Sequence, residues 1–392
     1  MSTLISNRTA RVKPSATMAV NAKAQELKRA GVDIINLSVG EPDFPTPQAV
    51  KQAAIDAINA NQTRYTPIDG TPELKSAIIT KLKQDNALDY NANEIIVTCG
   101  AKQALYNIAQ ALLNEGDEAI IPAPFWVSYS AIVELAEGIP VIVVCDHTQN
   151  FKLSADQLAQ AITTKTKLFF LNSPSNPTGM YYNLNELKAL GDVLRQHPNI
   201  VIVADDIYEY IFWGDKKFST FLNANPDLRE RTIVVNGVSK AYAMTGWRIG
   251  YSAAPEHITK PMKIVQSHST SCACSISQAA ATTALQLPRH DLQPMYDQFK
   301  KRHDLVVSGL RQIKGIEIKE AHGAFYVYPY VQTSIDKLGF EDDIELANYL
   351  LEEAHVATVP GTAFGTPGYL RISCATSDEL LSEAINRLQK AL

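Results

Sequence analysis

Side chains able to do chemistry follow several short apolar runs of this sequence. They lie in the segments Gly100-Ala-Lys102, Pro122-Ala-Pro-Phe-Trp126, Asn172-Ser-Pro-Ser-Asn-Pro177, Asp205-Asp206 and Asn236-Gly-Val-Ser-Lys240. In open α/β sheets ligands bind beyond the carboxyl ends of the strands, so these segments would meet at one edge of a sheet. Together they could bind an anion at a helix start, hold a cation on a carboxylate and form a covalent bond through an amine.

The motifs of several common enzyme classes are missing from the sequence. It contains no G-x-x-x-x-G-K-[ST], no G-x-S-x-G and no H-E-x-x-H, and it lacks the glycine fingerprints of hydride cofactors. Pyridoxal 5'-phosphate suits the remaining groups well. Its aldehyde needs a lysine, its ring nitrogen needs a carboxylate to stay protonated, and its phosphate suits a helix N-terminus and an arginine.

Seven short runs predict the strands that must position these groups. They are Glu94–Thr98, Glu118–Ile121, Val141–Val144, Leu168–Leu171, Ile200–Ala204, Thr232–Val235 and Ile249–Ala253. The runs are continuously apolar or β-branched, as in strands covered on both faces, and helical stretches such as 101–113 and 183–195 separate most of them. The second of these helices opens with Asn183 and Glu186 in capping-box spacing. The pattern predicts an α/β domain with a mostly parallel, seven-stranded sheet.

The C-terminal part has a different pattern and predicts a smaller α+β domain. Its expected elements are helices over 292–313, 344–354 and 377–390 and alternating strands over 316–319 and 324–328. We expect a large domain over 48–288. The small domain would comprise residues 1–47, which hold an N-terminal segment, and residues 289–392.

Composition narrows the function classes. The chain has 392 residues, of which 46% are hydrophobic and 20% charged, so it is globular rather than disordered. Its net charge of −5 offers no electrostatic basis for binding nucleic acid. Five unpatterned cysteines, the lack of a signal peptide and the polar character of the longest uncharged stretch, 264–288, favour a cytoplasmic protein that does not cross a membrane.

The segment from Asn236 through Lys240 and Arg248 to Gly250 resembles the lysine motif of the class I, pyridoxal-phosphate-dependent aminotransferases of fold type I. Further matching segments are Lys13-Pro-Ser-Ala-Thr17, 38–47, Arg64-Tyr-Thr-Pro67, Asn176-Pro-Thr-Gly179, 205–208, Pro360-Gly-Thr-Ala-Phe-Gly365 and Leu370-Arg-Ile-Ser373. Their order, over residues 13–373, makes the set specific. The sequence is most similar to the bacterial aspartate aminotransferase branch that opens with K-P-S-A-T.

The resemblance implies roles around the cofactor ring. Lys240 would form the Schiff base and, once released, move the proton between the substrate Cα and the cofactor. Asp205 would pair with the pyridine nitrogen, and Trp126 would stack on the ring. Tyr208 and Asn176 would donate hydrogen bonds to the phenolate oxygen O3′, which tunes the pKa of the imine.

The same resemblance implies a phosphate site and a shared active site. Arg248 would clamp the phosphate, the start of the helix at Gly100, Ala101 and Lys102 would cradle it, and Ser239 would add a hydroxyl. Tyr65 would reach the phosphate of a neighbouring subunit. A homodimer with shared active sites is therefore expected.

For the substrates, an amino acid and a 2-oxo acid, the resemblance implies a further set of contacts. Arg371 would bind the α-carboxylate as a bidentate fork, together with the Gly40 backbone N–H, and Phe364 would pack over the substrate; Trp126 and Asn176 would also touch it. Lys13 would bind a distal carboxylate. The expected reaction is ping-pong transamination between L-aspartate and 2-oxoglutarate, as in an aspartate transaminase.

Alternatives remain open at this point. The donor could be alanine or an aromatic amino acid, or the acceptor prephenate. Some relatives that accept prephenate have a threonine before Asn-Pro-Thr-Gly, where this chain has Ser175, and the segment 267–274 differs from the family's usual residues. A Mg²⁺-dependent nucleotide-binding protein could use Asp205 and Asp206 as ligands. A non-enzymatic regulator on the same fold ranks last.

Overall fold

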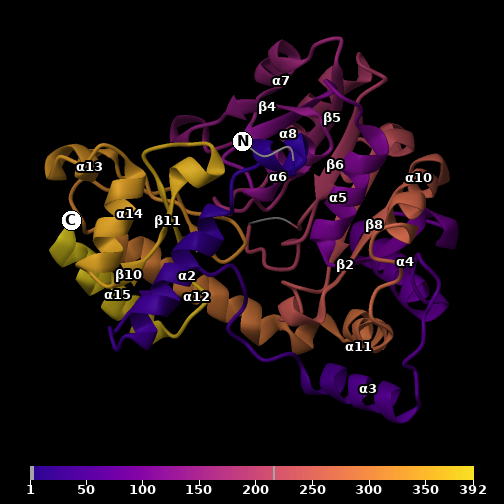
Figure 1. The fold of residues 1–392 in the computed structure, drawn as a ribbon, viewed down its shortest axis with the longest axis horizontal. Coiled ribbons are helices and arrows are strands. Elements are labelled where there is room, and N and C mark those ends of the chain that lie inside the picture. Colours follow the sequence, from indigo (N-terminus) through magenta and orange to yellow (C-terminus); the bar gives the residue numbers. More distant parts are fainter. Residues whose placement is uncertain (1–3, 215–216) are drawn as a thin grey trace.

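A computed structural model describes residues 4–214 and 217–392 of the chain (Figure 1). Its main sheet has seven strands in the order β2-β8-β7-β6-β5-β3-β4, in which β8 is antiparallel to both neighbours and the other pairs are parallel. The strands are β2 (Ile95–Cys99), β3 (Glu118–Ala123), β4 (Ile139–Val144), β5 (Thr166–Asn172), β6 (Val201–Asp205), β7 (Thr232–Gly237) and β8 (Ile249–Ala253). All seven predicted runs are strands of this one sheet, which confirms the predicted fold class.

Helices cover both faces of the sheet, which explains why the strand sequences are continuously apolar. In β2, Ile96 packs with α5 (Ala101–Leu112) and α10 (Glu256–Ser267), whereas Ile95 and Val97 face α4 (Pro72–Asn86) and α11 (Ser275–Gln286). The other helices of this part are α3 (Gln48–Asn59), α6 (Ser128–Leu135), α7 (Ala155–Ala161), α8 (Leu184–Arg195) and α9 (Phe221–Ala224).

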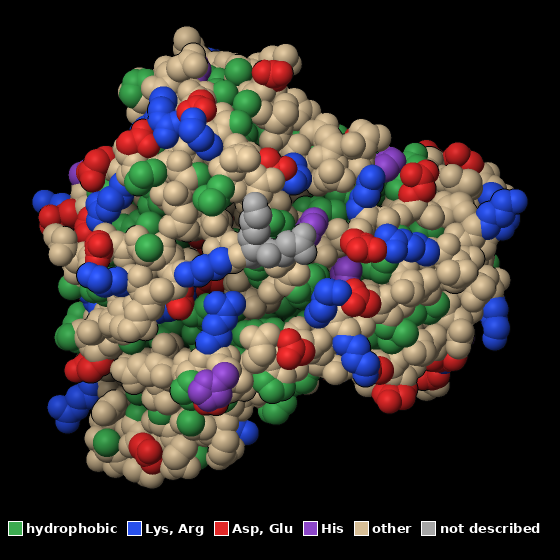
Figure 2. Space-filling view, turned by 180° about the vertical axis from the view of Figure 1, so that it is seen from behind, with side chains coloured by type: hydrophobic (Ala, Val, Ile, Leu, Met, Phe, Trp, Pro, Cys, Tyr) green, Lys and Arg blue, Asp and Glu red, His purple; other side chains and the backbone are tan. Residues whose placement is uncertain are grey.

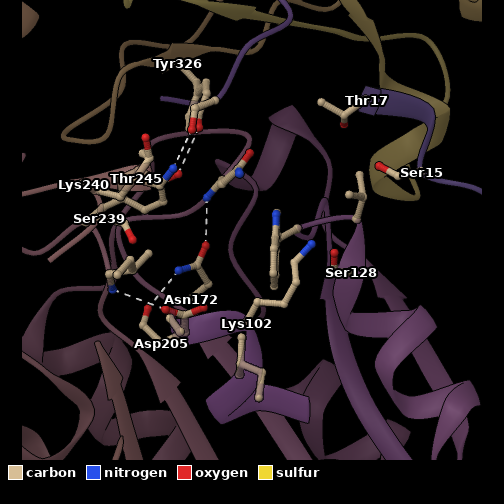
Figure 3. A pocket seen from close by; sticks show the side chains of 18 of the residues that line it. Ser15, Thr17, Lys102, Ser128, Asn172, Asp205, Ser239, Lys240, Thr245 and Tyr326 are labelled. Atoms are coloured by element: carbon tan, nitrogen blue, oxygen red, sulfur yellow. Dashed lines mark hydrogen bonds between the residues drawn. The ribbon is translucent and has the colours of Figure 1, made fainter. Parts of the chain in front are cut away.

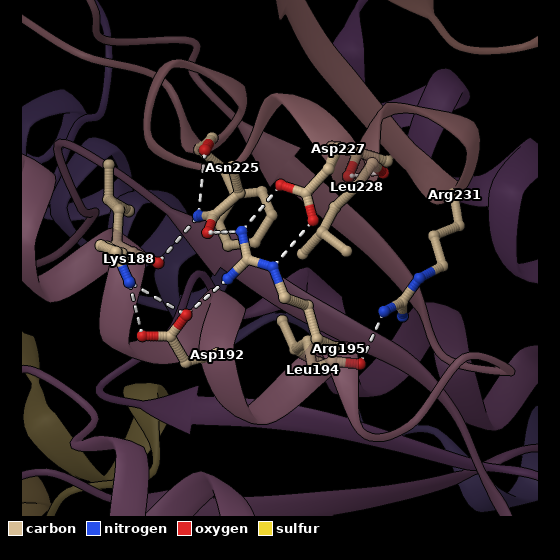
Figure 4. Close-up of polar contacts among 11 residues, drawn as sticks. Lys188, Asp192, Leu194, Arg195, Asn225, Asp227, Leu228 and Arg231 are labelled. Atoms are coloured by element: carbon tan, nitrogen blue, oxygen red, sulfur yellow. Dashed lines mark hydrogen bonds and ion pairs between the residues drawn. The ribbon is translucent and has the colours of Figure 1, made fainter.

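Helix α8 shows how side chains fix the ends of these elements. At its start, Asn183 accepts hydrogen bonds from the backbone N–H groups of residues 185 and 186 and Glu186 bonds back, which confirms the predicted capping box. At its end, Arg231 donates to the carbonyl of Leu194, and Arg195 forms a fork on Asp227 (Figure 4). Cationic side chains near the end of a helix can donate hydrogen bonds to its last carbonyls, and they interact favourably with the negative end of the helix dipole.

A second part of the chain packs beside the main sheet and combines short strands with helices. β1 (Ile35–Asn36) pairs with β10 (Val356–Ala357), and β12 (Leu370–Ser373) lies between β11 (Val359–Pro360) and β9 (Tyr326–Val327). Its helices are α2 (Ala16–Arg29), α12 (Gln293–Leu310), α13 (Gln332–Leu338), α14 (Asp343–Glu352) and α15 (Asp378–Ala391), and α1 (Asn7–Arg11) precedes them. The β1–β10 pair joins the N-terminal and C-terminal segments. The boundaries 48–288, 1–47 and 289–392 remain a prediction.

One predicted strand is wrong. Residues 316–319 form no strand, and only Glu317 makes an isolated bridge, to Tyr330. The alternating pattern is nevertheless obeyed, since Ile316 and Ile318 pack against the core while their polar neighbours are exposed. The alternating burial here comes from side-chain packing, and one bridge with two backbone hydrogen bonds stands in place of a partner strand. The predicted strand 324–328 is shorter than expected, with two residues in β9.

The surface of the molecule carries both signs of charge. Figure 2 shows Lys and Arg interspersed with Asp and Glu over the face it presents. Within residues 4–214 and 217–392, no helix is both long and apolar enough to cross a membrane.

Candidate active site

A cavity of about 340 Å³ lies at the carboxyl ends of the central parallel strands (Figure 3). Eleven of the predicted site residues line it: Gly40, Ala101, Lys102, Trp126, Asn176, Asp205, Tyr208, Ser239, Lys240, Arg248 and Arg371. Residues from the second part close its other side, among them Ser15, Thr17 and Tyr326. The cavity therefore lies between the two parts of the chain.

Lys240 reaches the cavity from the turn that follows β7. Its ammonium donates a hydrogen bond to the backbone carbonyl of Gly40, which belongs to the segment after β1. Burial and the nearby guanidinium of Arg371 lower the pKa of Lys240 to about 8. About a tenth of this amine is then neutral, and so nucleophilic and basic, at pH 7, compared with less than about a thousandth for an ordinary lysine.

Asp205 ends β6 and is buried at the floor of the cavity, where 4% of its surface is exposed. The hydroxyl of Tyr129 donates to its carboxylate at 2.6 Å, and the backbone N–H of Ile207 lies 3.3 Å from it. Burial raises the pKa of Asp205 to about 6, although both hydrogen bonds oppose the rise. A buried carboxylate of this kind is stabilised by a cationic partner in the cavity.

Asp206 is buried as well but does not line the cavity. It lies near Glu209, whose carboxylate pairs with Lys81 and accepts hydrogen bonds from Asn86 and Asn236. Burial and the Glu209 charge raise the pKa of Asp206 well above its ordinary value. The two neighbouring carboxylates thus have different surroundings.

Arg371, on β12, is the buried cation of the opposite wall, with 2% of its surface exposed. It donates to the Asn176 side-chain oxygen at 3.1 Å and to the Ser38 carbonyl at 2.6 Å, while its Nε has no hydrogen-bond partner. Because arginine can only donate, the contact identifies the Asn176 atom as oxygen and leaves the amide N–H groups of Asn176 free for another acceptor.

The start of α5 and Arg248 form an anion-binding corner. Gly100 precedes the helix with φ +75°, and a Cβ there would lie 2.4 Å from Arg248 Nη2, so only glycine fits. The first backbone N–H groups of the helix have no partner within it and attract negative charge. The Lys102 ammonium lies 4.9 Å from the centre of the Trp126 ring, and burial lowers its pKa.

Gly100 precedes α5 beside Arg248 without itself lining the cavity, and three further predicted residues lie outside it. Lys13 is exposed next to the segment that lines it, close enough to Glu134 for their charges to interact. Tyr65 is 93% exposed and lines a different hollow. Phe364 is fully buried, and its ring centre lies 5.1 Å from Arg371 Cζ; it supports the arginine from behind rather than forming the cavity wall.

Several residues of the site were not predicted from the sequence. Asn172 begins the segment 172–177; its side chain accepts a hydrogen bond from the Asn176 backbone N–H and donates one to the Asp205 backbone carbonyl. Tyr129 lies in the first turn of α6, three residues after Trp126, and the two rings are in contact, with centres 5.5 Å apart. Thr245 lies inside the lysine motif. Tyr326 comes from a separate sheet, and the predicted strand 324–328 marks it as a strand residue but not as a site residue.

Comparison with known proteins identifies the family. The sequence matches the family model described as "Aminotransferase class I and II" over residues 32–388. The chain belongs to the class I and II aminotransferases. It is 48% identical to an aspartate/prephenate aminotransferase of Nitrosomonas europaea, over 99% of each chain. The crystal structure of the aspartate aminotransferase from Rhizobium meliloti has a TM-score of 0.95 and 45% sequence identity. The match covers 100% of this chain and 99% of that one. The structure of the Thermus thermophilus aspartate aminotransferase with maleate has a TM-score of 0.93 and 41% sequence identity, and the match covers 99% of each chain.

Labelling of Lys240 in this aminotransferase, prepared without any aldehyde, should have its midpoint near pH 8, the lowered pKa of the ammonium. An amine-reactive reagent attacks only the neutral amine, and an ordinary lysine titrates at about 10.4. Peptide mass spectrometry after a short exposure at each pH measures the labelled fraction. Arg371→Leu removes a like charge and should move the midpoint upward. A wild-type midpoint near 10 would contradict this electrostatic account.

Proposed function

We propose that this aminotransferase uses pyridoxal 5'-phosphate to move an amino group between L-aspartate and 2-oxoglutarate by a ping-pong cycle. The observation that carries the proposal is the opposition, across one cavity, of a lysine amine of lowered pKa and a buried carboxylate. An anion-binding corner lies in the same cavity.

The residues present fit the cofactor. Lys240 would bind its aldehyde carbon, Asp205 its ring N–H and Trp126 the face of its ring. Asn176 has free amide N–H groups and Tyr208 a hydroxyl for the phenolate oxygen. The phosphate would be held by a group of residues at the opposite end: Gly100, Ala101, Lys102, Ser239 and Arg248. When bound, the cofactor supplies a carbonyl that condenses with amines and a protonated ring that accepts electron density from the substrate Cα.

The chain's own residues bind, orient and move the proton. Arg371 would hold the substrate α-carboxylate as a bidentate fork through its guanidinium N–H groups, assisted by the Gly40 backbone N–H. Fixing the carboxylate keeps the Cα–H bond, rather than the Cα–carboxylate bond, in the reactive direction. Lys240, as a neutral amine, would take the proton from Cα and return it at the cofactor carbon.

A dicarboxylic substrate requires a second cation, and Lys13 is the candidate. It precedes Ser15, Thr17 and Met18, which line the cavity, so a small shift of this segment would bring its ammonium to the rim. Binding of the right acid would then favour closure of the segment. Relatives named aspartate aminotransferase, one of them solved with maleate, support a dicarboxylate.

Prephenate is the second candidate acceptor, because a relative carries both aspartate and prephenate in its name. The different surroundings of Asp205 and Asp206 count against the magnesium–nucleotide alternative, since only Asp205 lines the cavity. We further propose a cytoplasmic homodimer in which Tyr65 reaches the partner's phosphate. The exposure of Tyr65 and of Ile55 and Ile58 on α3 supports a covered surface there.

A panel of amino donors, each with 2-oxoglutarate, tests the proposal. Aspartate should give the highest kcat/KM, and the purified protein should be yellow, with borohydride bleaching the colour and fixing the cofactor on Lys240. Prephenate with aspartate or glutamate tests the second acceptor. A colourless protein that binds ATP would contradict the proposed function.

Lys13→Ala should lower kcat/KM for aspartate by roughly 10- to 100-fold, because the distal carboxylate loses its cation. Alanine has no distal carboxylate, so its much lower kcat/KM should change less than about twofold. Lys23→Ala, an exposed lysine further along the same region, is the matched control. Equal losses with aspartate and alanine would remove Lys13 from substrate recognition.

A further inference from the structure

Tyr326 connects two groups of the candidate site that come from different parts of the chain. It lies on β9 and is fully buried, yet its side chain lines the cavity. Its hydroxyl oxygen lies 3.0 Å from the hydroxyl oxygen of Tyr208. The guanidinium carbon of Arg371 lies 4.6 Å from the centre of its ring. One side chain thus touches both the predicted carboxylate clamp and a predicted cofactor ligand.

Packing around Tyr326 and Tyr208 fixes the positions of their two rings. The two rings meet edge to face, with centres 5.9 Å apart and planes at 78°. A Cβ at Gly40 would lie 2.8 Å from the Tyr326 hydroxyl, so glycine is required opposite it. Tyr208 also packs edge to face on Phe325, which fixes its ring from a second side. Both hydroxyl positions are therefore set by packing.

The direction of the hydrogen bond matters because each phenol has a single proton to donate. If Tyr208 donated to Tyr326, it would have no proton left for an acceptor in the cavity. Burial raises the pKa of both phenols, and the Arg371 cation opposes the rise at each of them, so charge alone does not set the direction. The 3.0 Å contact allows either hydroxyl to donate, so Tyr208 can keep its proton for an acceptor in the cavity only if Tyr326 is the donor of the pair.

We propose that Tyr326 is a positioning residue whose hydroxyl donates to Tyr208, so that the Tyr208 proton points to the phenolate oxygen of the cofactor. This inference rests on the proposed function. A phenol that accepts a hydrogen bond becomes a stronger donor itself. The Tyr326–Tyr208 chain therefore stabilises negative charge on the cofactor oxygen and lowers the pH at which the bound cofactor loses its proton.

Tyr326→Phe in the holoenzyme tests the proposal, because it keeps the ring under Arg371 and removes only the hydroxyl. We expect the absorbance-detected pKa of the bound cofactor to rise by about half a pH unit. In a Tyr208→Phe background the same change should give no further shift. KM for the amino donor should stay within about twofold, since Arg371 keeps its stacking partner.

Tyr328→Phe is the matched control, since it removes another buried hydroxyl, bonded to Thr366 at 2.7 Å, two residues further along. It should leave the spectroscopic pKa unchanged, and its melting temperature shows the general cost of such a change. An unchanged pKa in Tyr326→Phe, or an equal shift in the Tyr208→Phe background, would overturn the inference. A wild-type protein that binds no pyridoxal phosphate would instead overturn the proposed function.

Discussion

Lys240→Ala should lower the transamination rate by about 10⁴-fold or more. The loss combines two roles, since the amine that bonds the cofactor is also the base that moves the substrate proton, and acid–base catalysis alone contributes roughly 10²- to 10⁴-fold. Single-turnover measurements of the half-reaction with aspartate check this. A small primary amine such as ethylamine, added at high concentration, should restore part of the rate, because the cavity left by the side chain can admit it.

Lys102→Ala is the matched control for this prediction. Its ammonium lies in the same cavity, 4.9 Å from the Trp126 ring, but its predicted contribution is the backbone N–H at the start of α5, which alanine keeps. Its loss should therefore be far smaller, and amines should not rescue it. A Lys240→Ala enzyme that retained more than about a hundredth of the rate would remove this lysine from the centre of the mechanism.

Asp205→Asn should lower kcat roughly 10²- to 10³-fold, which is the scale for removing one preorganised electrostatic contact in a site closed to water. Asparagine keeps the size of the side chain and the contact with Tyr129, so the change isolates the negative charge. Steady-state kinetics at saturating cofactor separate this effect from weaker cofactor binding.

Asp206→Asn provides the comparison one residue away. Its carboxylate is buried beside Glu209, outside the cavity, and neutralising it removes a repulsion. We expect kcat to change less than about threefold and stability to stay equal or rise. Equal losses at 205 and 206 would favour a site in which both carboxylates bind one ligand, as the magnesium–nucleotide hypothesis requires.

The sequence predicted the parts of the site that follow strands of the main sheet. Lys240, Asp205 and Asn176 stand within a few residues of apolar runs, and the edge at which parallel strands end brings them together. Arg371 was found only through the resemblance of its segment. Tyr326 and Tyr129 were not found, because their contacts join elements far apart in sequence and neither follows a predicted strand.

The errors have a similar physical origin. The alternation at 316–319 predicts which side chains are buried but not whether a partner strand runs alongside. Phe364 lies in a segment that matches the family, which suggested contact with the substrate. In the structure its ring packs against Arg371 instead. Periodicity reports the burial of a side chain, and it does not report the neighbour that buries it.

The placement of Arg371 and Lys240 on different parts of the chain has an energetic consequence. Arg371 lies on β12 of the second part, and Lys240 follows β7 of the main sheet, so their separation depends on how the two parts are arranged. A substrate that contacts both ends of the cavity must favour the arrangement in which both are within reach. A second ligand that binds elsewhere and favours the same arrangement would raise the affinity for the substrate. By thermodynamic reciprocity, the substrate would raise the affinity for that ligand by the same factor.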